Sequence, residues 1–129
     1  SEILPGVMTV LEFLKANHQP IALGSASKNA RPILEKTGIL SYFDAIVDGN
    51  DVSNAKPDPE VFLQAAQKLG ISNENSIVFE DSVAGIQAAN IAAMTSIGIG
   101  EAAILNEAKF NFQDFTYIDE AFLNSLINN

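Results

Sequence analysis

A short apolar strand that runs directly into two adjacent carboxylates is the feature that most constrains how this chain can fold. Residues 76–79 read Ser-Ile-Val-Phe, and Glu80 and Asp81 follow them. A run of β-branched and aromatic residues bounded by polar ones is typical of a buried strand. Ser82 is then placed to cap the next helix. We therefore expect the two carboxylates at the carboxyl end of a strand, where open α/β sheets bind their ligands.

Glu80 and Asp81 are not expected to share one task, because adjacent side chains on a strand point to opposite faces. One carboxylate can face a metal ion while the other supports a neighbouring loop. The plainer alternative is a solvated turn between strand and helix, since acidic residues are common before helix N-termini. The residues in the neighbouring loops distinguish these two interpretations.

Helix and strand patterns alternate along the whole chain. Strands are predicted at residues 21–23, 44–47, 77–79, 94–99 and 117–118. Helices are predicted at residues 7–16, 28–36, 59–69, 82–90 and 119–127, with a further short helix after residue 100. Ser27 and Asp58 have the chemistry of N-caps for the second and third of these helices. The alternation predicts an α/β fold with a doubly wound parallel sheet, in one domain.

The composition excludes several classes of function. Lys and Arg number 7 against 16 Asp and Glu, which gives a net charge of −9 and disfavours nucleic acid and anionic membranes as partners. The chain has no cysteine, so it carries neither a disulfide framework nor a thiolate zinc site. No apolar run reaches membrane-spanning length, and the first residues do not form a basic segment followed by an apolar one. We expect a cytoplasmic protein.

Two further polar groups follow the predicted strands. Ser25 comes after residues 21–23, and Lys56 lies in the loop after residues 44–47. Parallel strands bring these loops to the same edge of the sheet as Glu80 and Asp81. A hydroxyl, an ammonium and two carboxylates suit a phosphoryl group held against Mg²⁺. Taken singly, each residue has a plainer interpretation, such as a turn serine or a solvated lysine.

Ser27, Lys28 and Asn29 add a possible anion site at the start of the second predicted helix. The first turn of a helix offers free backbone N–H groups and a positive dipole end. The plainer alternative is that Lys28 is an ordinary first-turn lysine, although a cation there opposes the dipole and is mildly unfavourable.

Three stretches resemble the second, third and fourth motifs of the haloacid-dehalogenase superfamily of phosphotransferases. They are residues 24–29 (Gly-Ser-Ala-Ser-Lys-Asn), 56–62 (Lys-Pro-Asp-Pro-Glu-Val-Phe) and 79–89 (Phe-Glu-Asp-Ser-Val-Ala-Gly-Ile-Gln-Ala-Ala). The second and third stretches are typical of the enzymes with a small helical cap. The first stretch is similar to that of sugar-phosphate mutases.

The resemblance implies a role for each site residue. Ser25 and the Ala26 amide would hold the transferring phosphoryl group, and Lys56 would bridge phosphate and the nucleophilic carboxylate. Asp81 would ligate Mg²⁺ with support from Glu80. A second phosphate, needed only if a bisphosphate intermediate forms, would be bound by Ser27, Lys28 and Asn29.

One motif of the superfamily is absent from these 129 residues. No Asp-x-Asp-Gly sequence supplies an aspartyl nucleophile and a general acid, and residues 48–51 (Asp-Gly-Asn-Asp) have the wrong spacing. The helical cap is also missing. We therefore expect the C-terminal part of a core domain, inactive alone, whose partner is an N-terminal segment of the same protein. In the superfamily that segment supplies a central strand between the strands ending at Leu23 and Phe79.

Other functions stay open at this point. A sugar-phosphate phosphatase would use the same motifs, and the cap that would distinguish it lies outside the sequence. A signalling receiver domain also combines acidic, hydroxyl and lysine groups on a parallel sheet. In receivers the acidic pair comes first along the chain, whereas Ser25 and Lys56 precede Glu80 and Asp81 here. A noncatalytic phosphate-binding fragment is the third alternative.

Overall fold

The computed structural model describes residues 4–128, which fold into an α/β structure. The helices are α1 (Val7–Ala16), α2 (Ala30–Thr37), α3 (Glu60–Leu69), α4 (Val83–Ile91) and α5 (Glu120–Ile127). The strands are β1 (Ala22–Gly24), β2 (Ala45–Val47), β3 (Ile77–Glu80), β4 (Thr95–Ile99) and β5 (Phe110–Phe112). Short 3-10 helices are η1 (Leu40–Tyr42), η2 (Asn73–Asn75) and η3 (Phe115–Tyr117).

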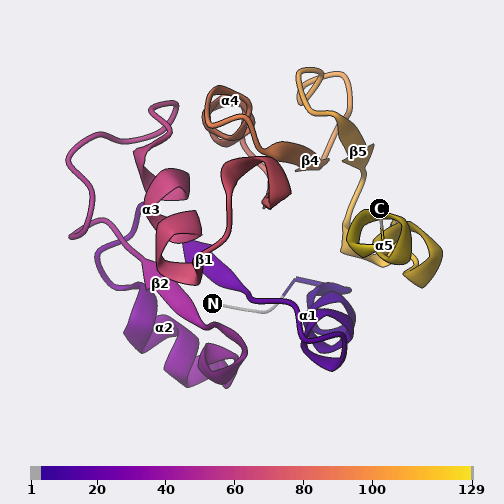
Figure 1. Cartoon of the computed structure of the whole chain (residues 1–129), viewed down its shortest axis with the longest axis horizontal. Helices are drawn as coiled ribbons and strands as arrows, with labels where there is room; N and C mark the ends of the chain where they lie inside the picture. Colours follow the sequence, from indigo (N-terminus) through magenta and orange to yellow (C-terminus); the bar gives the residue numbers. More distant parts are fainter. Residues whose placement is uncertain (1–3, 129) are drawn as a thin grey trace.

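The strands form two parallel sheets. Strand β1 pairs with β2, and β3, β4 and β5 pair in that order. In the first sheet Leu23 is opposite Ile46, and in the second Phe79 is opposite Ile97. Figure 1 shows β1 and β2 on one side of the molecule, and β4 and β5 on the other. All pairings are parallel, as the alternation of helices and strands predicts.

A cavity of about 580 Å³ separates the two sheets. Its lining includes residues 21–24 of the β1 region and residues 77–80 of β3, together with apolar side chains of α1, α3 and α5. Within residues 4–128, β1 and β3 therefore face each other without a shared hydrogen-bond ladder. This agrees with the expectation that one strand is missing between them, and the core is incomplete in this sense.

Helices pack on both faces of the strands. On one face, α3 and α4 form a buried cluster with strands β2 and β3, which contains Val47, Phe62, Val78 and Ala88. On the other, α1 and α5 cover the three-stranded sheet through Val10 and Leu123, which pack against Ile97. These two apolar layers confirm the predicted doubly wound arrangement.

The structure corrects the boundaries of several predicted elements. Helix α2 begins at Ala30 after Asn29, so Ser27 and Lys28 lie in the preceding turn and do not start the helix. Pro59, and not Asp58, is the N-cap of α3, although Asp58 Oδ1 still accepts the N–H of Glu60 (3.0 Å).

The largest errors lie after residue 100. Residues 117–118 do not form the last strand, because Tyr117 ends η3 and Ile118 is outside any strand, and β5 lies earlier, at residues 110–112. The alternating apolar side chains of Phe110 and Phe112 were the available signal for that strand. Residues 101–109 form turns, without the predicted short helix.

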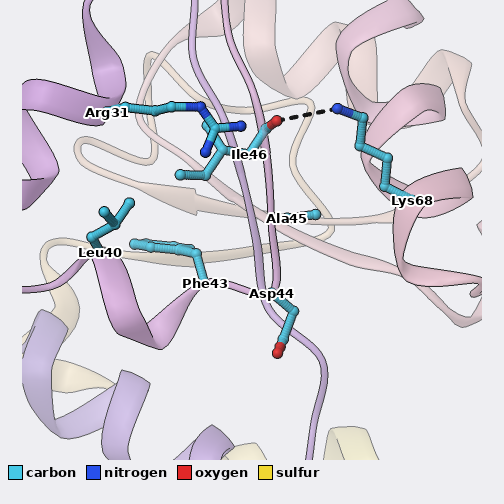
Figure 2. A pocket seen from close by; sticks show the side chains of 7 residues that line it. All are labelled: Arg31, Leu40, Phe43, Asp44, Ala45, Ile46 and Lys68. Carbon is cyan, nitrogen blue, oxygen red and sulfur yellow. Dashed lines mark hydrogen bonds between the residues drawn. The ribbon is translucent and has the colours of Figure 1, made fainter.

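The outer edge of β2 is partly closed by a lysine. Lys68 of α3 points its ammonium at the Ile46 carbonyl (3.4 Å), at the rim of a cavity of about 400 Å³. Arg31 of α2 approaches β2 from the opposite side (Figure 2). A lysine beside an edge strand opposes pairing of that edge with another chain.

Among the described residues, no helix has the length and apolar character required to span a membrane.

Candidate active site

The centre of the site is an ion pair between Lys56 and Glu80. Lys56 Nζ lies 2.8 Å from Glu80 Oε2, and the two side chains are 19% and 10% exposed. Lys56 comes from the loop before α3, and Glu80 is the last residue of β3. The structure therefore brings together two residues that are 24 positions apart in the sequence.

The Glu80 carboxylate is also fixed by the start of α4. Its Oε1 accepts the N–H groups of Asp81 (3.0 Å) and Ser82 (3.3 Å) and the Ser82 hydroxyl (3.2 Å). Ser82 in turn caps α4, because its Oγ accepts the N–H of Gly85 (3.0 Å). A β-carbon at position 85 would overlap the Glu80 carboxyl group. Glycine at this position therefore lets the carboxylate lie directly against the helix.

These contacts set the protonation of the two carboxylates. Burial alone raises the pKa of Glu80, but the hydrogen bond and positive charge of Lys56 outweigh it, and the pKa lies below the usual value. For Asp81, burial and then the hydrogen bond and negative charge of Glu80 raise the pKa above the usual value. Glu80 is thus committed to Lys56, while Asp81 is the carboxylate that a cation would stabilise.

Asp81 fits a role as a magnesium ligand, but it cannot hold the ion alone. Its side chain is exposed at the carboxyl end of β3 and supplies hard carboxylate oxygens. Among residues 4–128, no group of three or more His, Cys, Asp or Glu side chains lies close enough to form a metal site. When bound, the ion would neutralise charge on a phosphoryl group, and further oxygens would have to come from a substrate phosphate or another segment.

Ser25 begins a loop that is ordered by a chain of hydroxyl contacts. The N–H of Ser25 donates to Val47 O (2.8 Å), which fixes the loop to the end of β2. Ser25 Oγ accepts the N–H of Ser27 (3.1 Å), and Ser27 Oγ accepts the N–H of Asn29 (3.0 Å). Ser25 and Ser27 thus satisfy turn amides, as the plainer interpretation expected. Each hydroxyl still keeps its own hydrogen, which it can donate to an anion.

Phe62 connects the serine loop to the lysine. Its ring lies under Lys56 Nζ, 5.0 Å from the ring centroid. The same ring is 3.4 Å from where a β-carbon would sit on Gly24, the residue before Ser25. Gly24, Phe62 and Glu80 also line the cavity between the sheets. The end of β1, helix α3 and the Glu80 carboxylate therefore meet at that cavity.

Two supporting residues were not predicted from the sequence. Glu60 accepts the N–H groups of Ser53 (3.0 Å) and Asn54 (2.9 Å), which orders the loop leading to Lys56. These backbone donors lower the pKa of Glu60. Phe62 was assigned only to the apolar face of its helix. For Glu60 the only available signal was its place at the start of a helix, where an acidic side chain is ordinary.

Comparisons with known proteins agree with this geometry. The family model of the haloacid dehalogenase-like hydrolases matches residues 1–93. The β-phosphoglucomutase of Bacillus subtilis is 40% identical over 100 residues, which cover 78% of this chain and 44% of that protein. A phosphorylated carbohydrates phosphatase of Thermotoga maritima is 38% identical over 114 residues, covering 84% of this chain and 52% of that protein.

A solved structure shows the same arrangement over nearly the whole chain. The crystal structure of β-phosphoglucomutase from Clostridium difficile superposes with a TM-score of 0.92 and 38% identity, over 98% of this chain and 56% of that one. The all-parallel α/β core, with polar side chains at the carboxyl ends of its strands, defines a class of Rossmann-type folds. Within that class, the chain belongs to the haloacid dehalogenase-like hydrolase family. It spans about half the length of the curated relatives that it matches.

Proposed function

We propose that these residues form part of a Mg²⁺-dependent phosphotransferase that acts on a sugar phosphate in the cytoplasm. The reaction that fits best is that of a β-phosphoglucomutase, which interconverts β-glucose 1-phosphate and glucose 6-phosphate through a bisphosphate and an aspartyl-phosphate. By complete enzyme we mean a protein in which an Asp-x-Asp-Gly strand and a helical cap precede these residues. The 129 residues alone are expected to be inactive.

In this proposal each polar group has one task at the transferring phosphoryl group. The Ser25 hydroxyl and the Ala26 amide donate hydrogen bonds to its oxygens. The Lys56 ammonium, already oriented by Glu80, neutralises its charge and that of the nucleophilic carboxylate. Asp81 holds Mg²⁺, with Glu80 in support. The carboxylate that accepts the phosphoryl group would come from a strand in the cavity between β1 and β3.

The observation that favours a mutase over a phosphatase is the loop from Ser27 to Asn29. It contains one lysine and one asparagine, both exposed, in the turn that follows Ser25. A phosphatase has no need to bind a second phosphate, whereas a bisphosphate intermediate has to be held by the phosphate that is not being transferred. The mutase among the relatives supports the same choice, and the phosphatase among them keeps the alternative open.

The test is to follow both products from one substrate. The complete enzyme is given β-glucose 1-phosphate and Mg²⁺, with a trace of glucose 1,6-bisphosphate. We expect glucose 6-phosphate to form faster than inorganic phosphate is released. Release of inorganic phosphate alone would establish the phosphatase, and binding without either product would establish a noncatalytic phosphate-binding protein.

A further inference from the structure

The turn after β2 contacts the loop that contains Lys28. The N–H of Gly49 donates to Ser27 O (3.0 Å). The side-chain amide of Asn50 donates to Lys28 O (3.2 Å), across 22 positions of sequence. The carbonyl groups of the two peptides that flank the Lys28 α-carbon thus both accept hydrogen bonds from a different segment. Helix α2 does not order this turn, because it starts only at Ala30 and its N-cap residue makes no side-chain cap hydrogen bond.

Gly49 allows this contact because it has no side chain. A β-carbon at position 49 would overlap the Ala26 carbonyl oxygen and would lie 3.1 Å from Lys28 Cγ. The carbonyl belongs to the backbone and cannot move without moving the loop. Any larger residue would therefore push the turn away from the loop and displace the stem of Lys28.

Two hydrogen bonds within the turn fix its backbone, and they fix the position of Asn50 with it. Asp48 is 8% exposed, and its Oδ1 accepts the N–H of Asn50 (2.9 Å). Asp51 Oδ2 accepts the N–H of Asp48 (2.9 Å) from the other end of the turn. A hydrogen-bond donor whose own backbone is held in this way can fix the position of the loop to which it donates.

We propose that Gly49 and Asn50 are positioning residues, which hold Lys28 and Asn29 at the distance required by the second phosphate of a sugar bisphosphate. This inference rests on the proposed function, because it assigns a purpose to a loop that only a bisphosphate would use. Neither residue touches the substrate. Gly49 sets how closely the turn approaches the loop, and Asn50 fixes the Lys28 carbonyl.

The experiment uses the complete enzyme and three variants. Asn50→Ala removes the donor, and Asn50→Asp replaces it with a carboxylate that repels the Lys28 carbonyl oxygen. Asn17→Ala is the matched control, because the Asn17 side-chain amide donates to Phe13 O (2.8 Å) at the end of α1, before β1. Each protein is titrated with glucose 1,6-bisphosphate and with inorganic phosphate. Amide hydrogen exchange is measured over residues 26–30.

The expected pattern separates positioning from general damage. Asn50→Ala should weaken bisphosphate binding roughly 2- to 10-fold, the size of one exposed hydrogen bond, and Asn50→Asp should weaken it further. Exchange should rise at residues 26–30 but not in β3, inorganic phosphate binding should change less, and Asn17→Ala should match the unaltered enzyme. If Asn50→Ala binds bisphosphate like Asn17→Ala, the inference is wrong. If the unaltered enzyme binds bisphosphate but only hydrolyses phosphosugars, the mutase assignment fails while the positioning result still stands.

Discussion

Lys56 and Glu80 are paired at 2.8 Å although the Lys56 ammonium is also the group proposed to meet the phosphoryl group. The pair keeps a half-buried cation at a fixed place before any substrate arrives. Glu80 is held from its other side by Ser82, and Lys56 by the ring of Phe62. From this pairing we predict how the pKa of Glu80 and the stability of the protein change when Lys56 is replaced.

Lys56→Met should raise the pKa of Glu80. Burial, which raises this pKa, would then be opposed only by the hydrogen bonds that Asp81 and Ser82 donate to the carboxylate. In the unaltered protein the lowered pKa of Glu80 contributes stability that is present above the usual value of 4.5 and is lost as the pH falls through the lower folded pKa. In Lys56→Met this contribution is weakened, so the cost of about 1–3 kcal/mol at neutral pH shrinks in acid, where the unaltered protein loses the same stability. Titration of Glu80 by NMR in the complete enzyme, and urea unfolding at several pH values, would measure both effects. Lys36→Met, at the end of α2, is the control.

Mg²⁺ should bind weakly to the 129 residues alone. Asp81 and Glu80 supply few oxygens, Glu80 is engaged by Lys56, and Mg²⁺ prefers six oxygen ligands. Calorimetric titration with Mg²⁺ measures the affinity, and submicromolar binding would contradict the assignment. In the complete enzyme, Asp81→Asn should weaken Mg²⁺ binding more than Asp58→Asn, which alters an aspartate at the start of α3.

Lys28→Ala and Asn29→Ala should impair isomerisation more than hydrolysis of the phosphoenzyme. Both residues lie in the turn after Ser25, and in the proposed function they bind the second phosphate and not the transferring one. We expect a loss of a few kcal/mol at most in the activation free energy of isomerisation, the size of charge-assisted hydrogen bonds, ~1.5–3 kcal/mol each. Steady-state rates of both reactions in the complete enzyme provide the comparison. An equal loss of the two activities would contradict a separate role of this loop in binding the second phosphate.

Residues 1–129 alone should not form a stable monomer. The cavity of about 580 Å³ leaves Leu23 and Phe79 without neighbours on one side, and it leaves two strand edges unpaired. At ~25 cal/mol per Å² of apolar surface, several such side chains amount to several kcal/mol, comparable with the stability of a domain. Thermal unfolding with light scattering tests this on the expressed segment. A cooperative transition from a monodisperse monomer would show that the two sheets are stable without a strand between them.

The sequence predicted the parts of the fold that depend on short-range chemistry. The strand from Ile77, the Ser82 cap and the breaks at Gly38 and Gly70 follow from apolar runs and turn residues, and the structure has them. The stretch from residue 101 to residue 118 was predicted wrongly, although the helix after it is present. There β5 is stabilised by pairing with β4 and by the contact of Phe110 with Phe122, both of which are tertiary interactions.

The sequence predicted a set of site residues, Ser25, Lys56, Glu80 and Asp81, from their places at strand ends. The structure pairs two of them, Lys56 and Glu80. No pattern indicated that Glu80 would be paired to Lys56, because a separation of 24 positions carries no local signal. The same limit applies to Asn50, whose partner is a backbone carbonyl in another loop. Such contacts depend on how two loops meet, which is decided by packing beneath them.

The position of the Glu80 carboxylate restricts which amino acid can occupy position 85. Because any β-carbon there would occupy the space of the Glu80 carboxyl group, the pairing of Glu80 with Lys56 tolerates a single amino acid at that codon. A saturation library at codon 85, selected for function, should return glycine alone. A protein with any other residue at this position would have to move the Glu80 carboxyl group away from the start of α4.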